Sequence, residues 1–221
     1  MVGSALLGDV DEETLERAAA KVGLALKPCV AGERLLAQGD TAVWAGLVLE
    51  GRVRMEAPSG QGQVAVMGWA GPGEVFAEAY AVLGDVPLMV DVVADLDGRV
   101  LWFDAARLLA LSGDPDCSVL ARNLCRIMAR RNVSLSRRAY VGSPRTIRGK
   151  LLAYLAFEER AGGGAPGEWF EVPVGRQQLA DYLGVDRSAL SRELGRMGRE
   201  GLVAVSGRRF LLKGGAGEGG L

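Results

Sequence analysis

The chain has 221 residues, a formal net charge of −1 and 49% apolar residues, so it can bury a core and is not expected to be disordered. It contains no histidine, which excludes histidine-based acid–base catalysis, a Ser-His-Asp triad, ordinary zinc sites and His-ligated haem. Its three cysteines favour a reducing cytoplasm, and we find neither a signal peptide nor an apolar run of about 18 residues that would cross a membrane.

The small net charge conceals two halves of opposite sign. Residues 1–113 carry 16 acidic and 8 basic side chains, a net of −8, whereas residues 114–221 carry 11 acidic and 18 basic side chains, a net of +7. Most of the basic residues are arginine, which suits contacts with phosphates and guanine. The asymmetry suggests that the C-terminal half meets a polyanion. The alternative is a solvated surface in an arginine-rich sequence, and composition alone does not decide between them.

The first half of the chain shows one short helix followed by strands. Residues 11–22 are expected to form the helix, with apolar residues on one face. Between Cys29 and Phe103, short apolar runs alternate with turn signals such as Gly39-Asp40 and Gly71-Pro72-Gly73. Many short strands at this spacing predict an all-β roll or barrel. The stretch 74–83 interrupts the pattern and is interpreted as a short helix inside the roll.

Two helices are expected after the roll. The first covers residues 104–111, and the second is long, running from Pro115 to about Tyr140 with Asp114 as its N-cap. A narrow apolar stripe along the long helix must pack against something, and we predict that it joins two copies of the chain in a coiled-coil-like dimer. The alternative is a helix that lies only on its own domain. The stripe consists of Leu120, Leu124, Ile127 and Met128.

The remainder of the chain is predicted to form a second folded region. Ser143 and Pro144 are expected to open a helix that ends near Arg160, and Trp169 to Val172 is expected to form a strand. Two short helices follow, and residues 202–205 and 208–212 form a β-hairpin. The glycine-rich last eight residues, 214–221, are expected to be disordered.

Residues 176–194 carry the most specific local signal, a helix, a tight turn and a second helix. Gly184 supplies the turn and Asp186 caps the second helix. At 100° per residue, Leu190, Leu194 and Met197 fall within about 60° of one another and face the core. The opposite side carries donors near the helix N-terminus, as reading of the major groove requires, and the hairpin behind it completes a winged helix-turn-helix. The alternative is an ordinary helical pair with a solvated arginine face.

We therefore expect this region to bind double-stranded DNA, with the hairpin as the wing. The predicted DNA-contacting residues are Arg176, Gln177, Arg187, Ser188, Ser191, Arg192, Arg208 and Arg209.

The expected fold class is α+β. It comprises a β-roll sensing domain at residues 1–113, a long dimerisation helix at 114–142, a winged helix-turn-helix at 143–213 and the tail at 214–221. This order of elements resembles the Crp/Fnr family of bacterial transcription regulators. The resemblance rests on Gly32-Glu33, Gly39-Asp40, Leu49 to Val53, Gly73-Glu74 and, most specifically, residues 176–194.

The resemblance implies a double-stranded β-helix or jelly-roll sensor like a cyclic-nucleotide-binding domain, and a homodimer joined through the long helix. An effector in the roll would reposition two reading heads over a palindromic operator. Arg187 and Arg192 match the family's base-reading arginines, and Ser191 matches a base-contacting serine of its oxygen-responsive branch. Ser188 stands where many members carry a glutamate, so the family's usual half-sites are not assumed here.

The family's cyclic-nucleotide cassette is incomplete in this chain. Glu78 is kept, but Ala77 replaces a glycine, and Leu88-Met89 stand where the family carries the arginine and serine that bind the cyclic phosphate. No Arg or Lys lies between Arg54 and Arg99, so a buried phosphate would lack a cationic partner and cyclic AMP is not the expected effector. The candidate effector pocket consists of Phe76, Glu78, Tyr80, Leu88, Met89 and Asn123.

No cofactor is predicted, because Cys29, Cys117 and Cys125 do not make the cysteine cluster of an iron–sulfur centre. The leading interpretation is a cytoplasmic, homodimeric DNA-binding transcription regulator, gated by an unidentified small molecule and not an enzyme. Its partners would be a palindromic operator, a second copy of the chain and, as a further candidate, RNA polymerase, but no membrane. The alternative is a regulator that is ligand-independent or responds to oxidation of Cys117 and Cys125. A cupin-like enzyme ranks last because cupins rely on a histidine-rich metal site.

Overall fold

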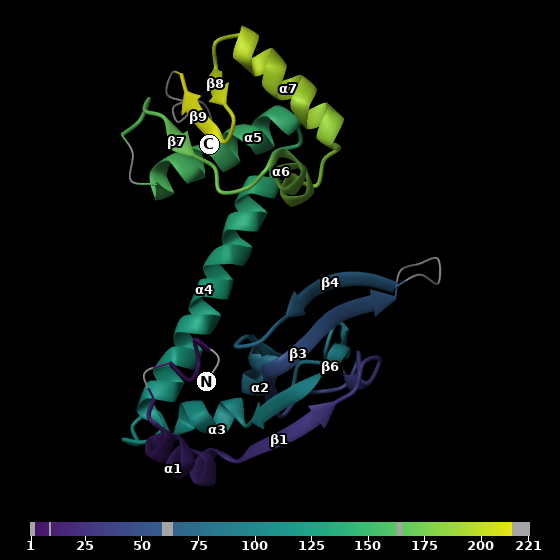
Figure 1. Cartoon of the computed structure of the whole chain (residues 1–221), viewed down its shortest axis with the longest axis vertical. Helices are drawn as coiled ribbons and strands as arrows, with labels where there is room; N and C mark the ends of the chain where they lie inside the picture. Colours follow the sequence, from purple (N-terminus) through teal and green to yellow (C-terminus); the bar gives the residue numbers. More distant parts are fainter. Residues whose placement is uncertain (1–2, 9, 59–63, 163–164, 214–221) are drawn as a thin grey trace. The chain divides into compact units, whose positions relative to one another are not determined.

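In a computed structural model of the chain, residues 3–8, 10–58, 64–162 and 165–213 are described (Figure 1). The chain forms two compact units, Met1–Arg131 and Asn132–Leu221, and each is considered by itself. The boundary falls inside the long helix α4 (Ser118–Gly142). The tail expected at residues 214–221 lies outside the described residues.

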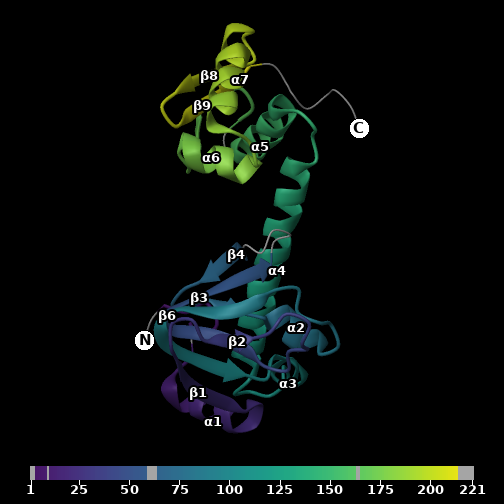
Figure 2. The same cartoon turned by 90° about the vertical axis from the view of Figure 1, so that its right-hand side faces the viewer.

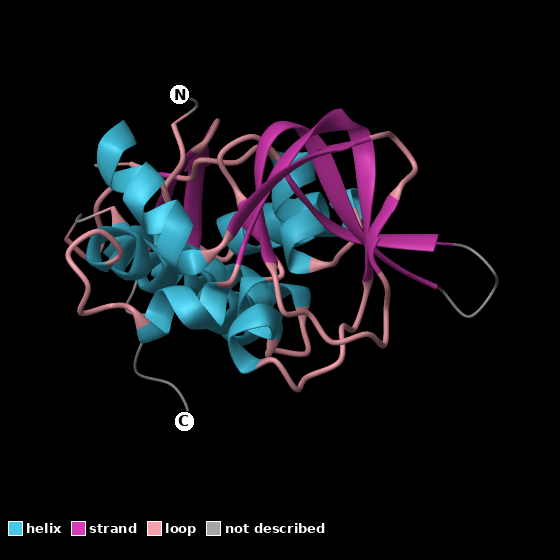
Figure 3. Ribbon diagram, turned by 90° about the horizontal axis from the view of Figure 1, so that it is seen from below, coloured by secondary structure: helices cyan, strands magenta, loops and turns pink. Residues whose placement is uncertain are grey.

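Six strands of the N-terminal unit wind into one antiparallel sheet, drawn in magenta in Figure 3. The strand order is β1-β6-β3-β4, with β2 paired to β6 and β5 paired to β3. The predicted β-roll is therefore confirmed. The strands are β1 (Leu24–Cys29), β2 (Arg34–Leu36), β3 (Ala45–Pro58), β4 (Val64–Ala70), β5 (Val75–Phe76) and β6 (Asp91–Phe103).

The long strands β3 and β6 form the frame of the roll and bend where they pass close to each other. Their pairing register shifts between Val48 and Glu50 and again between Glu50 and Arg52. At this point a Cβ atom on Gly98 would lie 2.1 Å from the backbone oxygen of Glu50. The bend therefore requires a residue without a side chain at position 98.

Three short helices accompany the roll, with α1 (Glu12–Val22) at one end and α2 (Glu78–Leu83) and α3 (Ala105–Ala110) beside the strands (Figure 2). Asp11 caps α1 by accepting a 2.8 Å hydrogen bond from the backbone N–H of Thr14. Helix α2 is the short helix expected inside the roll. One apolar cluster fills the roll, and a second lies between its strands and the helices.

The long helix begins later than expected. It starts at Ser118 rather than Pro115, and a turn of residues 114–117 precedes it. The Asp114 carboxylate accepts a hydrogen bond from the backbone N–H of Asp116 at 2.9 Å, and the Asp114 carbonyl accepts one from the N–H of Ser118 at 2.8 Å, so Asp114 caps this turn. The same carboxylate binds the Lys21 ammonium group at 2.7 Å and ties the turn to α1.

The apolar stripe of α4 covers its own unit. Leu120 is 5% exposed and Leu124 is fully buried in the cluster that contains Phe103, and Ile127 and Met128 pack against that cluster. Leu120 and Leu124 are therefore core residues of their own unit and leave no surface for a dimer seam, which contradicts their predicted role. Ile127 and Met128 are half-buried, and their part in a seam remains a prediction. The helix pattern could not reveal this core, because an apolar stripe does not identify its partner.

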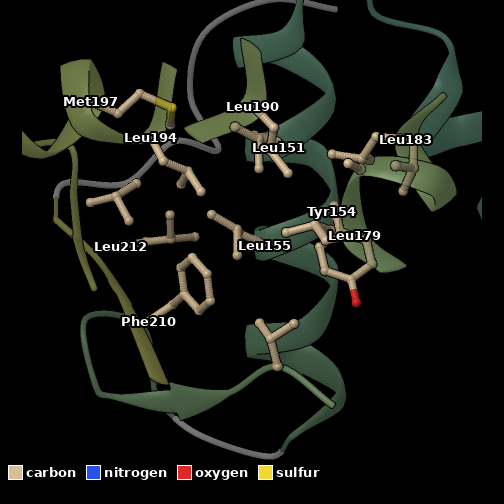
Figure 4. Packing of buried hydrophobic residues seen from close by; sticks show 14 of the residues in the cluster. Leu151, Tyr154, Leu155, Leu179, Leu183, Leu190, Leu194, Met197, Phe210 and Leu212 are labelled. Carbon is tan, nitrogen blue, oxygen red and sulfur yellow. The ribbon is translucent and has the colours of Figure 1, made fainter. Parts of the chain in front are cut away.

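The C-terminal unit packs three helices against a small sheet. The helices are α5 (Ile147–Ala161), α6 (Arg176–Leu183) and α7 (Arg187–Arg199), and the strands β7 (Phe170–Glu171), β8 (Val203–Ser206) and β9 (Arg209–Leu212) pair in the order β7-β9-β8. Figure 4 shows Leu155 of α5 and Phe210 of β9 pointing toward each other in the core. The expected strand near residue 170 and the expected hairpin are confirmed.

The start of α5 differs from the prediction. Its N-cap is Thr146, whose hydroxyl oxygen accepts a 3.0 Å hydrogen bond from the backbone N–H of Gly149. Ser143, the expected cap, donates its hydroxyl to the carbonyl of Tyr140 at 2.9 Å and thus belongs to the turn that ends α4.

None of the described helices combines the length and the apolar character that a membrane span requires.

Candidate nucleic-acid interface

The helix-turn-helix is formed as the sequence predicts. Gly184 adopts a left-handed backbone, with φ of 62°, and turns the chain between α6 and α7. Asp186 caps α7 by accepting a 2.8 Å hydrogen bond from the backbone N–H of Ala189. Leu190, Leu194 and Met197 are buried, which fixes the side of α7 that faces the core.

The opposite side of α7 presents exposed polar side chains at its N-terminal end. They are Arg187, Ser188, Ser191 and Arg192. Ser188 donates its hydroxyl to the Asp186 carboxylate at 2.5 Å, and the Arg192 guanidinium donates to the Ser188 hydroxyl at 3.0 Å. The Ser188 hydroxyl and the N–H of Ala189 lower the pKa of Asp186, so this carboxylate stays ionised. This series of hydrogen bonds, from Asp186 through Ser188 to Arg192, holds the Arg192 guanidinium in place on the exposed face.

Arg187 is exposed, and its side chain makes no hydrogen bond or ion pair with the described residues. Gln177 is also exposed and donates its side-chain amide to Asp181 at 2.8 Å, one turn further along α6. Both side chains are accessible to a partner, and their DNA contacts remain predictions.

Arg176, at the start of α6, contacts the hairpin that forms the wing. Its guanidinium lies 4.7 Å from the centre of the Phe210 ring and donates a 3.2 Å hydrogen bond to the carbonyl of Gly207. Burial lowers the pKa of this half-buried guanidinium, although it remains charged at neutral pH. Arg176 therefore ties the first turn of α6 to the tip of the hairpin, a positioning role that the sequence did not suggest.

The wing carries the two arginines expected there. Arg208 pairs with Glu171 at 3.2 Å, and the Arg209 guanidinium lies 5.7 Å from the centre of the Trp169 ring. Both arginines are exposed, so these contacts orient their side chains without burying the charges. A hollow of about 370 Å³ separates α7 from β8, with Arg176 and Ser191 on its walls.

One further arginine braces α7 from the side of α5. Arg148 of α5 binds the Glu193 carboxylate at 2.7 Å and that of Glu200 at 2.8 Å. These two carboxylates raise its pKa, so the brace is permanently charged. The partners lie 45 and 52 residues away in the chain, and no local sequence pattern announces such a pair.

In the N-terminal unit, the buried polar residues predicted for an effector already have protein partners. Glu78 is 3% exposed and pairs with the guanidinium of Arg131 on α4, which also donates to the carbonyl of Val75. Asn123 is 6% exposed and donates its amide to the carbonyls of Leu6 and Gly8, each at 3.0 Å. Sequence reasoning missed Arg131, because it lies on the long helix, outside the cassette.

The other predicted pocket residues do not gather around one described cavity. Phe76 and Leu88 are buried in the roll, and Tyr80 is half-buried. Met89 is 73% exposed, which contradicts its placement inside the roll. Both residues lie in the loop between α2 and β6, where Leu88 turns inward and Met89 faces solvent.

The cysteines are free thiols. Cys29 and Cys117 are buried, and burial raises the pKa of both thiols, which keeps them protonated and unreactive. Cys125 is exposed on α4. This arrangement argues against Cys117 as a redox sensor.

A β-roll that continues into a long helix, together with a winged helix-turn-helix, is the domain composition of a DNA-binding regulator. Residues 26–113 match the cyclic nucleotide-binding domain family, and residues 149–213 match the family of Crp-like helix-turn-helix domains. The chain belongs to the Crp/Fnr family of DNA-binding transcription regulators.

Individual relatives are distant. The transcriptional activator protein FnrL of Cereibacter sphaeroides is 35% identical over 43 residues, which span 20% of this chain and only 17% of that relative. The catabolite activator protein of Thermus thermophilus is 23% identical in structure alignment, with a TM-score of 0.50 over 95% of this chain and 94% of that one. CprK complexed with OCPA is 15% identical, with a TM-score of 0.54 over 90% and 89% of the two chains. At these identities the two structures show the fold alone.

Proposed function

We propose that the protein is a homodimeric regulator that reads a palindromic operator with α7 and the wing, gated by a small molecule other than cyclic AMP. The separation of the two faces of α7 carries this proposal. Its core face is filled by buried leucine and methionine, whereas the side chains at its N-terminal end that face away from the core are exposed and polar. They are Arg187, Ser188, Ser191 and Arg192. A DNA partner would place the protein in the cytoplasm, with RNA polymerase as a further partner.

The chemistry of the roll supports an effector other than a cyclic nucleotide. The buried Glu78 is already neutralised by Arg131, and Leu88, in the position of the family's arginine, is buried and apolar. A cyclic phosphate placed there would lose its hydration without gaining a cation, which is costly.

A different face of α4 is free to form a dimer. The exposed residues Cys125, Ala129, Val133 and Tyr140 fall within about 80° of one another at 100° per residue. A seam with small residues at two of its positions allows two helices to approach closely, and Val133 and Tyr140 supply apolar area. This face replaces the stripe that the core of the N-terminal unit occupies.

Selection of DNA from a random pool, followed by affinity measurements on the selected sequence, tests the proposal. Two half-sites about 34–36 Å apart are expected, because a dimer places two recognition helices one turn of the duplex apart. Arg192→Ala should weaken binding by about 1–3 kcal/mol and relax preference at one base pair, because this guanidinium is positioned on the reading face.

Arg199→Ala is the matched control, since it removes the same charge from the C-terminal end of the same helix. We expect it to change affinity less and equally across sequences. Equal, sequence-independent weakening by both variants would make Arg192 a phosphate contact. Recovery of single unpaired half-sites would refute the dimer.

A further inference from the structure

A hollow of about 510 Å³ opens on the β-roll at a place that no predicted effector residue lines. Its walls come from β1, β2, the segment before β3, and the end of β6. This volume lies within the range of small-molecule sites, whereas an apolar void between α1 and the roll, about 20 Å³, holds little more than one water molecule. The residues that matter for its chemistry are Lys27, Leu35, Leu36, Thr41, Trp44 and Trp102.

Two indole rings dominate the walls. Trp102 is half-buried and its ring meets the ring of Phe76 edge-on, with the ring centres 5.4 Å apart, so the roll's interior supports it from behind. Trp44 is 39% exposed. Leu35 and Leu36 complete an apolar surface that is left open to solvent, which is unfavourable for a chain that has no use for it.

One basic side chain, Lys27, lines the hollow beside this apolar surface. Lys27 is exposed, no acidic side chain is among the described residues that line the hollow, and Lys27 has no ion pair within the described part of the chain. Thr41 adds one hydroxyl. Flat aromatic walls, one unpaired ammonium group and little further hydrogen-bonding capacity match a flat apolar molecule with one negative charge.

We propose that this hollow binds aromatic carboxylates, with the ring against Trp44 and Trp102 and the carboxylate at Lys27. That such a ligand is the effector rests on the proposed function. The site differs from the cassette around Glu78, where the sequence led us to expect a ligand.

Calorimetry of the full-length protein with 2-naphthoate, its neutral amide 2-naphthamide and cyclic AMP tests the site. We expect 2-naphthoate to bind and Trp44→Leu to weaken it at least about tenfold through loss of ring stacking. Lys27→Gln should weaken 2-naphthoate at least about tenfold and leave 2-naphthamide unchanged. Trp69→Leu is the matched control, because Trp69 is 56% exposed on β4 and does not line the hollow.

Four outcomes would contradict the proposed site. Equal affinity for the acid and the amide, a loss of binding in Trp69→Leu, tighter binding of cyclic AMP, or no binding up to about 1 mM would overturn the site. Because Lys27 and Trp44 are at the surface, their replacement should not unfold the roll, and thermal unfolding of each variant checks this.

Measurements of affinity for the selected operator test the proposed function separately from the binding site. A shift of at least about threefold in operator affinity on adding 2-naphthoate supports the effector role, and an unchanged affinity with intact 2-naphthoate binding refutes that role. Intact 2-naphthoate binding by a protein that binds no DNA would refute the proposed function and leave the site standing.

Discussion

Gly98 shows how a single residue permits the β-roll to close. The position lies where β6 bends past β3, and the backbone oxygen of Glu50 occupies the place of a side chain. Backbone atoms cannot move aside as the end of a flexible side chain can. The identity of this residue is therefore dictated by main-chain geometry rather than by hydrophobic packing.

Gly98→Ala should destabilise the N-terminal unit by at least about 1–3 kcal/mol, because its Cβ would clash with the main chain of β3. Gly113→Ala is the matched control, since nothing lies within 4 Å of a Cβ at that position, and should change stability by less than about 0.5 kcal/mol. Urea unfolding followed by tryptophan fluorescence measures both, as three of the four tryptophans lie in this unit. Equal stability of the two variants would contradict the close approach of the strands.

At the scale of elements, α4 is held to the roll by more than its apolar stripe. Arg131 reaches across to the buried carboxylate of Glu78 at the start of α2 and to the carbonyl of Val75 at β5. The guanidinium side chain is 45% exposed whereas the carboxylate side chain is 4% exposed, so the carboxylate depends on the arginine for its charge balance. This pair fastens the helix to the two elements that immediately precede and follow Ala77.

Arg131→Ala should cost the N-terminal unit about 1–3 kcal/mol, because it leaves a buried carboxylate without its partner. Arg130→Ala removes the same charge from the neighbouring exposed position and should cost less than about 0.5 kcal/mol. Adding Glu78→Gln to Arg131→Ala should recover part of the loss, since the unpaired charge disappears. Additive losses in a double-mutant cycle by urea unfolding would show that the pair is not coupled.

At the scale of the whole molecule, the three cysteines offer a probe of assembly. A dimer seam along the exposed face of α4 would bring Cys125 of one copy opposite Cys125 of the second. Mild oxidation should then produce a disulfide-linked dimer on a non-reducing gel, and Cys125→Ser should abolish it while light scattering still reports a dimer. Cys29 and Cys117 should not cross-link, because they are buried and their thiols stay protonated.

Two outcomes would count against this arrangement. Light scattering that reports a monomer at micromolar concentration would contradict the dimer itself. A cross-link that survives in Cys125→Ser would place the contact elsewhere on the chain.

Features with a local physical cause could be predicted from the sequence. Gly184 and Asp186 mark the turn and the cap of the helix-turn-helix because backbone conformation and capping depend on neighbours in the chain. The order of strands and helices likewise followed from periodicity and turn residues. Asp114 shows the limit, since the local pattern indicates a cap but not that the same carboxylate binds the remote Lys21.

Features that depend on remote residues could not be predicted. The stripe containing Leu124 indicates burial but not whether the covering surface belongs to the same chain. The pairs of Arg131 with Glu78 and of Arg148 with Glu193 join residues 53 and 45 positions apart, and the hollow at Trp44 and Trp102 combines four segments. Two tryptophans and a lysine at such separations form no recognisable motif until the roll brings them together.

The division of α7 into two faces makes its operator preference evolvable. Substitutions at Arg187, Ser191 and Arg192 change the reading surface without touching a buried side chain, so new half-sites can be explored at almost no cost to folding. Ser188 is less free, because it connects the capping carboxylate of Asp186 to Arg192. A library that varies the three free positions and keeps Asp186 and Ser188 should therefore yield folded proteins with altered DNA targets at high frequency.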